Sequence, residues 1–366
     1  MKVLVVSGIW PPDVGGPASH APEVAAFLQE RGHDVRAFVS ADRAPTPESY
    51  PLDWVARRSP FRHGQAVGKI ARLARGADVV YSTGMVGRAG SGSTLAGTPF
   101  VLKIAGDPAF ERALRRGLTS GTLAEFQHER SPATLPLRLV RNAIVRRSAH
   151  VITPSTFLRD AVFAWGVPNS RVSVLPNPAP AISTAVPRED LRARFGMQGP
   201  TLVFAGRLVA AKSLELGIEA ARRAGIDLVV AGDGPERSRL EGLGHARFLG
   251  ALPREQVLEL FRAGDVSLLT SSWENFPHGV VESLAAGTPV VATAVGGVTE
   301  IIGDGENGLL VPSGDIEATT AAIQRIFFEP GLLERLRGAA AVSVSDYSRE
   351  RVYERLLDIL HAAAER

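Results

Sequence analysis

The sequence predicts an α/β fold made of two Rossmann-like, doubly wound domains that face each other across a cleft. Three features indicate this fold. The 366 residues exceed what one hydrophobic core usually organises. Short apolar runs alternate with helix-compatible stretches in both halves of the chain. A proline-rich segment separates the halves, and clustered prolines continue neither a central strand nor a helix.

The first half opens with a β-α-β pattern. The apolar run Val3 to Ser7 is followed by a helix-compatible stretch, Ala18 to Arg31, and by a second apolar run, Val35 to Val39. The first run is too short for the core of a signal peptide and soon meets two prolines, so it is interpreted as a buried strand. Further strands are predicted at 78–81, 99–102 and 150–153.

The second half repeats the alternation after the proline-rich segment 174–187. Its predicted strands are 201–205, 227–230, 247–249, 265–269 and 289–292, and its predicted helices are 213–224, 236–243, 254–263 and 278–286. We therefore expect an N-terminal domain at 1–180, a C-terminal domain at 181–345, and a last helix at 346–366 that either stays there or crosses back to the first domain.

Composition narrows the classes of function. Without cysteine the chain has no disulfides, thiolate metal sites or thiol nucleophiles. No segment approaches the ~18 apolar residues of a membrane span, which predicts a soluble, cytoplasmic protein. Residues 1–180 hold 22 Lys and Arg against 13 Asp and Glu, a net +9, and the remainder holds 19 against 25, a net −6. The basic half either faces an anionic partner or is an ordinary solvated surface.

The basic stretch from Arg138 to Arg147 leaves the same alternatives open. Its apolar residues recur at roughly helical spacing among arginines, so one face could pack and the other could be cationic. The pattern fits peripheral contact with anionic lipid at the inner face of the membrane, and it equally fits a surface helix on a sheet.

Two cations follow the first predicted strand of the second half. Arg207 and Lys212 lie at a strand-to-helix turn, where a guanidinium fork and an ammonium could together neutralise a diphosphate leaving group. Two unrelated surface cations would give the same spacing.

The segment from Glu274 to Glu282 joins a predicted strand to a predicted helix. The free N–H groups at the start of that helix, around Gly279, suit an anion such as phosphate. Glu282 could accept hydrogen bonds from a ribose diol, and Glu274 could hold sugar hydroxyls or stabilise positive charge at the anomeric carbon. Each residue alone also has an ordinary structural explanation.

Together these motifs carry a family resemblance. Gly206-Arg207-Leu208 with Lys212, Gly232-Asp233-Gly234-Pro235, Phe248-Leu249-Gly250, the pair Glu274 and Glu282, and 285–291 stand in the order and spacing of a known family. The chain resembles the bacterial retaining glycosyltransferases of family 4 (glycosyl transferases group 1), which have the GT-B fold.

The resemblance implies a metal-independent hexosyltransferase that retains the anomeric configuration, with no cofactor beyond a UDP- or GDP-linked sugar as co-substrate. The first domain would bind a saccharide, lipid-linked or small-molecule acceptor. In the second, Arg207 and Lys212 would bind the donor diphosphate, Glu282 the ribose and Glu274 the transferred sugar. The other expected donor contacts are Gly250, Leu252, Phe276, Pro277, His278, Gly279 and Val280.

The first half carries the remaining predicted site residues. Gly15 and Gly16 are similar to the family's glycine loop, which approaches the donor phosphates. Many relatives have a His-Asp pair after the strand near residue 102, whereas this chain has Gly106-Asp107. Lys103 and Asp107 are therefore the predicted acceptor contacts, with Asp107 also a predicted catalytic residue.

Two other functions stay open. A nucleotide-sugar epimerase shares the architecture, and the missing histidine makes a non-catalytic nucleotide-sugar-binding relative conceivable. A dinucleotide oxidoreductase is disfavoured because the turn after the first strand lacks Gly-x-Gly-x-x-Gly, and nucleic-acid binding is disfavoured because aromatics are only 6% of residues.

Overall fold

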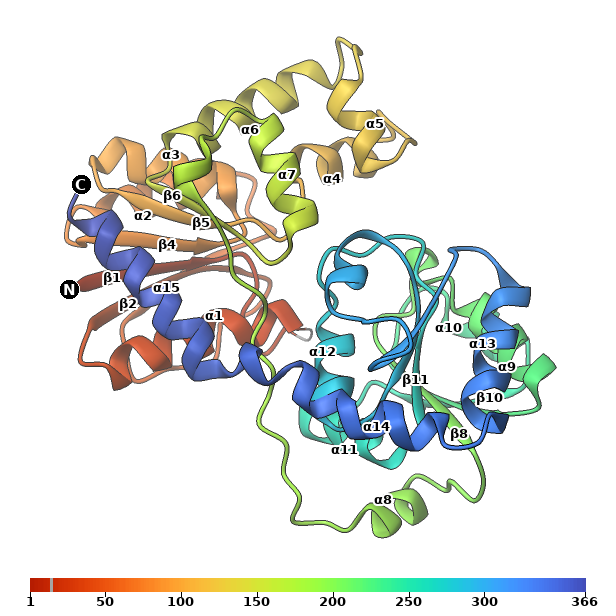
Figure 1. The fold of residues 1–366 in the computed structure, drawn as a ribbon. Helices are drawn as coiled ribbons and strands as arrows, with labels where there is room; N and C mark the ends of the chain where they lie inside the picture. Colours follow the sequence, from red (N-terminus) through yellow and green to blue (C-terminus); the bar gives the residue numbers. More distant parts are fainter. Residues whose placement is uncertain (14–15) are drawn as a thin grey trace. The chain divides into compact units, whose positions relative to one another are not determined.

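The computed structural model describes residues 1–13 and 16–366, and these form two compact units. The first unit contains Met1–Pro176 and Val352–Arg366, and the second contains Asn177–Arg351. The chain thus passes into the second unit within the proline-rich segment and returns at its end. Each unit holds one parallel sheet with helices on both faces, which confirms the prediction of two Rossmann-like α/β units (Figure 1).

The first unit is built on a seven-stranded sheet of order β3-β2-β1-β4-β5-β6-β7, in which every paired neighbour is parallel. Its strands are β1 (Lys2–Ser7), β2 (Asp34–Ala41), β3 (Leu52–Ala56), β4 (Val79–Thr83), β5 (Phe100–Lys103), β6 (His150–Thr153) and β7 (Val172–Val174). The edge strands β3 and β7 were not predicted. The sheet order reverses between β1 and β4.

The helices of this unit follow the strands in turn. They are α1 (Gly16–Glu30), α2 (Arg62–Ala74), α3 (Val86–Ala96), α4 (Pro108–Arg115), α5 (Leu123–His128), α6 (Leu135–Arg147) and α7 (Thr156–Ala164), with the short η1 (Asn169–Arg171). Successive residues of β1 point to opposite faces of the sheet, as its pleat requires. Val3 and Val5 pack in the core with α1, whereas Leu4 and Val6 pack in the core with α2 and α3.

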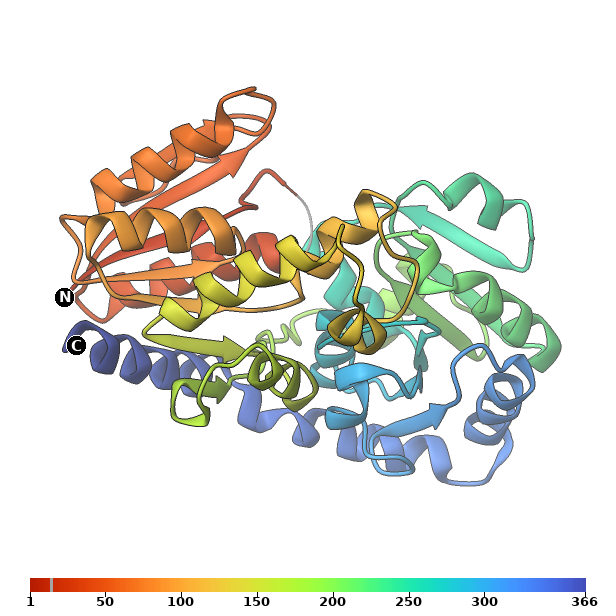
Figure 2. The same cartoon turned by 90° about the horizontal axis from the view of Figure 1, so that it is seen from above.

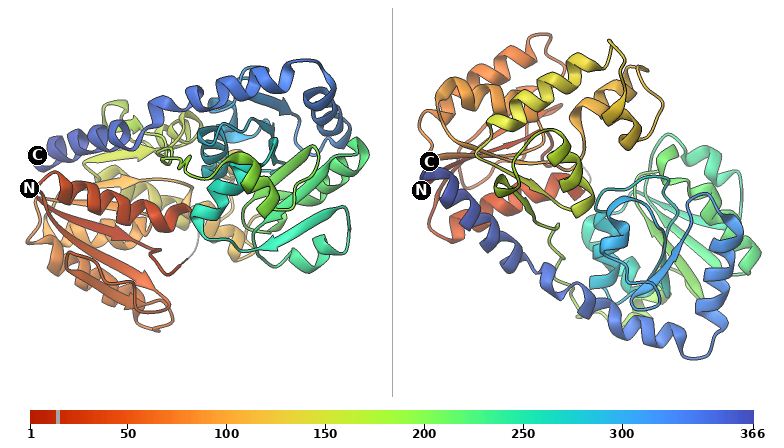
Figure 3. Two further views of the ribbon diagram at one scale, coloured as in Figure 1. Left: turned by 90° about the horizontal axis from the view of Figure 1, so that it is seen from below. Right: turned by 45° about the horizontal axis from the view of Figure 1, so that its top comes forward.

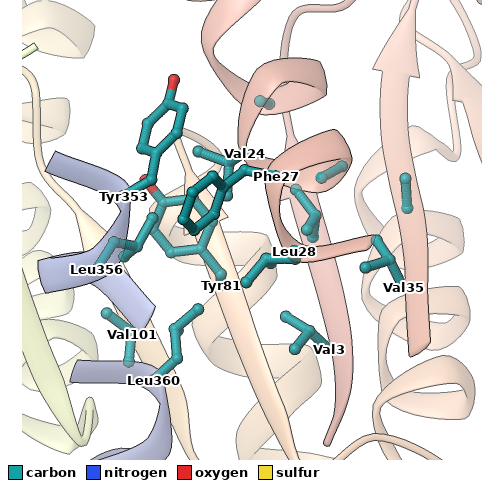
Figure 4. Packing of buried hydrophobic residues seen from close by; sticks show 14 of the residues in the cluster. Val3, Val24, Phe27, Leu28, Val35, Tyr81, Val101, Tyr353, Leu356 and Leu360 are labelled. Atoms are coloured by element: carbon teal, nitrogen blue, oxygen red, sulfur yellow. The ribbon is translucent and has the colours of Figure 1, made fainter. Parts of the chain in front are cut away.

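The C-terminal helix α15 (Arg349–Ala364) completes the first core. Figure 3 shows its C-terminal part lying beside α1. Tyr353, Leu356 and Leu360 are buried and point at Phe27 of α1 and at the strand residue Tyr81 (Figure 4). The last fifteen residues therefore supply one apolar face of the first unit's core, which the N-terminal segment alone would leave open to water.

The second unit is built on a six-stranded parallel sheet of order β10-β9-β8-β11-β12-β13, which reverses between β8 and β11. The strands are β8 (Thr201–Ala205), β9 (Asp227–Ala231), β10 (Ala246–Gly250), β11 (Val266–Leu269), β12 (Val290–Thr293) and β13 (Gly308–Val311). Its α-helices are α8 (Arg188–Arg194), α9 (Leu214–Ala224), α10 (Arg237–Glu241), α11 (Arg254–Ala263), α12 (His278–Ala285), α13 (Ile316–Phe328) and α14 (Leu332–Ser343).

The same alternation divides the second core. Leu202 and Phe204 of β8 pack in the core with α9 and α13, whereas Val203 packs in the core with α8 and α11. Figure 2 shows helices on both sides of these strands. Short 3₁₀ turns join the elements, namely η2 (Ala210–Lys212), η3 (Gly296–Glu300) and η4 (Ser345–Tyr347). The two neighbouring strands β8 and β11 end at the same edge of the sheet, so the segments that follow them meet there.

Candidate active site

The predicted donor residues follow the two strands at which the second sheet reverses its order. Arg207 and Lys212 come after β8, and Glu274 comes after β11. In open α/β sheets, ligands bind outside the carboxyl ends of the strands at such a reversal. The topology therefore gathers residues more than sixty positions apart at the edge of the sheet where a ligand is expected.

Hydrogen bonds hold these two segments together. The hydroxyl of Thr270 donates to the carbonyl oxygens of Lys212 and Ser213, over 3.1 and 3.0 Å. The backbone N–H of Ser272 donates to the carbonyl of Ala211 over 3.0 Å. Because these contacts fix the backbone on both sides, the position of the Lys212 side chain depends on the segment after β11.

Lys212 and Glu274 form an ion pair at this junction. The hydroxyl of Ser271 also donates to Oε1 of Glu274 over 2.7 Å, and Glu274 is only 8% exposed. A buried carboxylate with a charge-assisted partner and a hydroxyl donor keeps one defined orientation. The sequence indicated separate roles for these two residues and did not predict that they would touch.

Arg207 is exposed, and among residues 1–13 and 16–366 its side chain has no hydrogen-bond or ion-pair partner. Its backbone is fixed by the turn that follows β9. The N–H of Leu208 donates to the carbonyl of Asp233 over 2.9 Å, and a Cβ on Gly232 would lie 1.9 Å from the carbonyl oxygen of Gly206. The Gly-Asp-Gly motif thus holds the Arg207 turn in place while its guanidinium stays available.

The helix α12 begins at His278, directly after Pro277. Within the described part of the chain no side chain caps this helix, and the N–H groups of Val280 and Val281 donate to the carbonyl of Pro277. A Cβ on Gly279 would lie 3.5 Å from the carbonyl oxygen of Ala205, so this helix start lies beside the end of β8. Its partial positive charge adds to that of Arg207 and Lys212.

Phe276 and Val280 face the protein core. Phe276 is 7% exposed and packs at 5.8 Å from the ring of Tyr347, and Val280 lies in the same apolar cluster. The side-chain amide of Asn177 donates to the carbonyl of Phe276 over 3.2 Å. Their side chains are therefore directed away from a ligand at this edge of the sheet, and the backbone role that the family resemblance implies for them stays a prediction.

Glu282 lies one turn into α12 with its side chain 12% exposed. Nε of Arg254, the first residue of α11, is 3.5 Å from Oε1 of Glu282. The segment between Gly250 and Leu252 leads into α11, and the carbonyl of Gly250 accepts a 2.7 Å hydrogen bond from the N–H of Gly232. The sequence analysis did not single out Arg254, and no signal in its neighbourhood would have done so.

Lys103 is a buried member of a polar network in the first unit. Its Nζ lies 3.3 Å from Nε2 of His20, which in turn lies 3.0 Å from the hydroxyl of Tyr81. The hydroxyl of Tyr353, on α15, donates to Glu23 over 3.1 Å. Burial lowers the pKa of Lys103 to about 7, and the negative charge of Glu23 opposes this shift. The sequence predicted an acceptor contact at Lys103 and did not predict that His20 and Tyr353 would lie in the same buried region.

Asp107 has no exposed side-chain surface. One carboxylate oxygen caps α4 by accepting the backbone N–H groups of Ala109 and Phe110, over 2.8 and 3.2 Å. The other is ion-paired with Arg141 and accepts from the amide of Gln127 over 2.9 Å. These contacts engage both oxygens, so the geometry favours a role in positioning α4 over direct contact with a substrate.

One arginine of the basic helix α6, Arg141, is buried and does not face solvent. It is 5% exposed, pairs with Asp107 and stacks on the ring of Trp165 at 4.1 Å. The exposed apolar residues of α6 include Leu139 and Val140, at 58% and 57%. The helical period of α6 was predicted, but the inward direction of Arg141 depends on its contact with Asp107.

Of the predicted glycine loop, Gly15 lies outside the described residues, and Gly16 begins α1.

Two family models match the chain. "Glycosyl transferases group 1" matches residues 188–342, and "Glycosyl transferase 4-like domain" matches residues 15–178. Together they span most of both units. Among the described residues, no helix is long and apolar enough to cross a membrane.

Relatives agree with these models. The chain is 33% identical over 235 residues to D-inositol 3-phosphate glycosyltransferase of Acidothermus cellulolyticus, a match that covers 56% of this chain and about half, 51%, of that one. It is 26% identical to GDP-mannose-dependent alpha-mannosyltransferase of Mycobacterium tuberculosis, over 87% and 85% of the two chains. Anabaena Alr3699/HepE, solved in complex with UDP-glucose, has the same fold, with a TM-score of 0.80 at 18% identity over 99% of this chain and 100% of that one.

Proposed function

This chain belongs to the glycosyl transferases group 1, and on that premise we propose that it transfers a sugar from a nucleotide-sugar donor to an acceptor with retention of the anomeric configuration. The observation that carries the proposal is the ion pair between Lys212 and Glu274, at the reversal point of the second sheet and beside the start of α12. Lys212 can bind the anionic diphosphate of a nucleotide-sugar donor, and Glu274 can accept hydrogen bonds from its sugar.

The second unit is the proposed donor domain, and its donor is a UDP- or GDP-linked hexose. A relative named for GDP-mannose and a structural neighbour solved with UDP-glucose support these two classes. Arg207, Lys212 and the N–H group of Gly279 at the start of α12 would bind the diphosphate, because the N–H groups of Val280 and Val281 already donate to Pro277. Glu282 would accept hydrogen bonds from the ribose, and the segment from Gly250 to Leu252 would lie near the base.

In the proposed reaction, an acceptor oxygen forms a bond to the anomeric carbon while the bond from that carbon to the donor phosphate breaks. The leaving diphosphate gains negative charge in the transition state. Lys212, held in place by Glu274, and the available guanidinium of Arg207 stabilise that charge. A donor phosphate oxygen takes the acceptor's proton on the same face, which retains the configuration without a covalent intermediate or a metal.

Glu274 is the proposed sugar contact. Its second oxygen, Oε2, is not the atom that Ser271 and Lys212 engage, so it can accept from a sugar hydroxyl. A carboxylate acceptor makes a stronger hydrogen bond than a neutral one. Lys212 thus binds the diphosphate directly and positions Glu274, which binds the sugar.

The first unit is the proposed acceptor domain. We assign Lys103, with His20, to the polar floor of the acceptor site, and we assign Asp107 to positioning α4 through its pair with Arg141. The catalytic role predicted for Asp107 is thereby replaced by an indirect one.

The experiment that tests the function is a two-arm assay. The protein is first incubated with UDP- and GDP-linked hexoses alone, and then with a panel of saccharide acceptors. Transfer or slow hydrolysis with retained configuration is the expected result. Conversion of the donor to its epimer without an acceptor would instead establish the epimerase, and binding without any turnover would establish the non-catalytic relative. A thermal-shift screen of the donors comes first, because a ligand at a hundred times its Kd stabilises by about 2.7 kcal/mol.

We also propose a cytoplasmic protein that contacts the inner face of the membrane peripherally through α6. The exposed Leu139 and Val140 stand among arginines on that helix, a combination that suits anionic lipid. Co-sedimentation with phosphatidylglycerol vesicles, weakened in L139S/V140S, is the expected result. Equal sedimentation of the variant and the wild-type chain would contradict the proposed lipid contact of α6.

A further inference from the structure

The first unit contains a cavity of about 740 Å³ whose lining is almost entirely arginine. Seven of its eight lining residues are arginines and the eighth is His63. Arg57 and Arg58 come directly after β3, and Arg62 and His63 begin α2. A volume of this size lies within the range of small-molecule sites, which is roughly 300 to 1,000 Å³.

The other lining residues come from two further segments. Arg88 lies in the first turn of α3, which follows β4, and Arg112, Arg115 and Arg116 lie at the end of α4, which follows β5. All of the lining therefore derives from segments that follow strands of one parallel sheet. Because the carboxyl ends of parallel strands share an edge, the cavity lies where sheets of this kind bind their ligands.

Most of these arginines lack a carboxylate partner. Arg57 pairs with Asp13 and Asp42, and Arg115 lies 3.8 Å from Glu111. Among the residues that the structure describes, the side chains of Arg58, Arg62, Arg112 and Arg116 have no hydrogen-bond or ion-pair partner, and Arg88 reaches only the hydroxyl of Ser40, over 3.3 Å.

The arginines of two helices in the second unit differ in this respect. On α9 and α10 of the second unit, Arg222, Arg223, Arg237 and Arg239 each pair with a glutamate. Single unpaired arginines also occur elsewhere among the described residues, for example Arg36, Arg75 and Arg207, but the cavity gathers four of them in one place.

The positive charges of the cavity's arginines repel one another and lower the pKa values of two lining residues. Burial lowers the pKa of Arg88, and the neighbouring Arg62, Arg112 and Arg57 lower it further. Burial likewise lowers the pKa of His63, and Arg88, Arg62 and Arg112 add to that shift. Each shift reports that a positive charge is disfavoured there, so an anion that enters the cavity removes repulsion as well as gaining attraction.

We propose that this arginine cavity binds a phosphate or diphosphate group carried by the sugar acceptor. Guanidinium forks match phosphoryl oxygens bidentately, and a concave basic site concentrates its potential on a multiply charged anion. The inference rests on the proposed glycosyl transfer and specifies its acceptor as a phosphorylated molecule, either a soluble sugar phosphate or a lipid with a phosphorylated headgroup.

The test is a calorimetric titration with inorganic pyrophosphate. It uses the K212A background, so that the proposed donor diphosphate site contributes little. Arg62→Gln with Arg112→Gln removes two unpaired guanidiniums of the cavity, and Arg36→Gln with Arg75→Gln removes two exposed arginines of the same unit outside it. We expect the cavity variant to weaken pyrophosphate binding tenfold or more, and the control pair to leave it within about twofold.

Competition then separates the two sources of phosphate. Displacement of pyrophosphate by glucose 6-phosphate indicates a soluble acceptor, and displacement by phosphatidylglycerol vesicles indicates a lipid-borne one. If R62Q/R112Q does not fold, R58Q/R116Q replaces it, because both of its positions are exposed. Circular dichroism verifies folding in each case.

The proposal is overturned if the cavity variant binds pyrophosphate as tightly as the control pair, or if neither competitor displaces pyrophosphate. Failure of the proposed function has a different signature. In that case the wild-type chain neither binds nor turns over any nucleotide sugar, while the pyrophosphate titration still reports on the cavity.

Discussion

Lys212 and Glu274 form an ion pair although 62 positions separate them in the chain. Each lies in the segment that follows one of the two strands at which the second sheet reverses its order. The pair couples a cation suited to a diphosphate with a carboxylate suited to a sugar, so a change at either residue is expected to reach the other.

Removal of Lys212 should therefore have a broader effect than removal of Arg207. Each Ala substitution deletes a charge-assisted contact with the diphosphate, worth about 1.5 to 3 kcal/mol or roughly ten- to a hundredfold in donor binding. K212A additionally frees Glu274, so it should lower affinity for the nucleotide sugar more than for the nucleoside diphosphate. Calorimetry with both ligands measures the difference, and unchanged binding in both variants would remove the donor-site assignment.

Substitutions of Glu282 and Glu274 should differ in which ligand they weaken. Glu282→Ala is expected to weaken a nucleoside diphosphate and its nucleotide sugar by the same factor, because both ligands carry the ribose. Glu274→Ala is expected to weaken mainly the nucleotide sugar, because only that ligand carries the hexose. If both variants lose both ligands equally, the roles of the two residues are misassigned.

Asp107→Ala should act on stability. It leaves Arg141 buried without its carboxylate and removes the cap of α4, and breaking a buried pair in this way costs about 3 to 5 kcal/mol. The matched control is Asp160→Ala, whose pair with Arg159 is exposed and should contribute less than about 1 kcal/mol. Urea unfolding measures both. A D107A protein of wild-type stability with abolished transfer would restore Asp107 as a catalytic residue.

Lys103 should make stability depend on pH. Its folded pKa of about 7 lies below its ordinary value of 10.5, so between these values the unfolded chain binds more protons. Stability should therefore rise as pH increases from about 7 to about 10 and should change little below 7 on this account. Lys103→Met removes the contribution, so the variant's free energy of unfolding should have a smaller slope over that range. Parallel slopes for variant and wild type would show that Lys103 is not responsible.

Gly232→Ala should displace the turn that holds Arg207. The new Cβ would lie 1.9 Å from the carbonyl oxygen of Gly206, and φ at this position is +144°. We expect a loss of a few kcal/mol in stability together with weaker donor binding. Gly338→Ala is the control, because it lies in α14 with nothing within 4 Å and should stabilise by about 0.5 to 1 kcal/mol. Equal effects of the two changes would contradict the close-approach argument.

Most of the strands that the sequence located are covered on both faces; the edge strand β10, predicted at 247–249, is the exception. The predicted strand at 201–205 coincides with β8, because a parallel strand buried on both sides reads as an uninterrupted apolar run. The strands it did not predict, β3, β7 and β13, are edge strands of the two sheets. Edge strands carry mixed residues such as Asp53 of β3, or are as short as the three residues of β7, and neither gives a periodic signal.

Local pattern by itself determined two α/β units, the position of the proline-rich connection and the segments that carry Arg207, Lys212, Glu274 and Glu282, because these depend on neighbours within a few positions. Only the tertiary structure decided which side chains meet. From the sequence alone Arg141 is indistinguishable from a surface arginine, and only the fold places it beside Asp107. The arginines after β3, β4 and β5 form one cavity only because parallel strands bring their ends to a single edge. Charge pairing acts through space, and the sequence records only order along the chain.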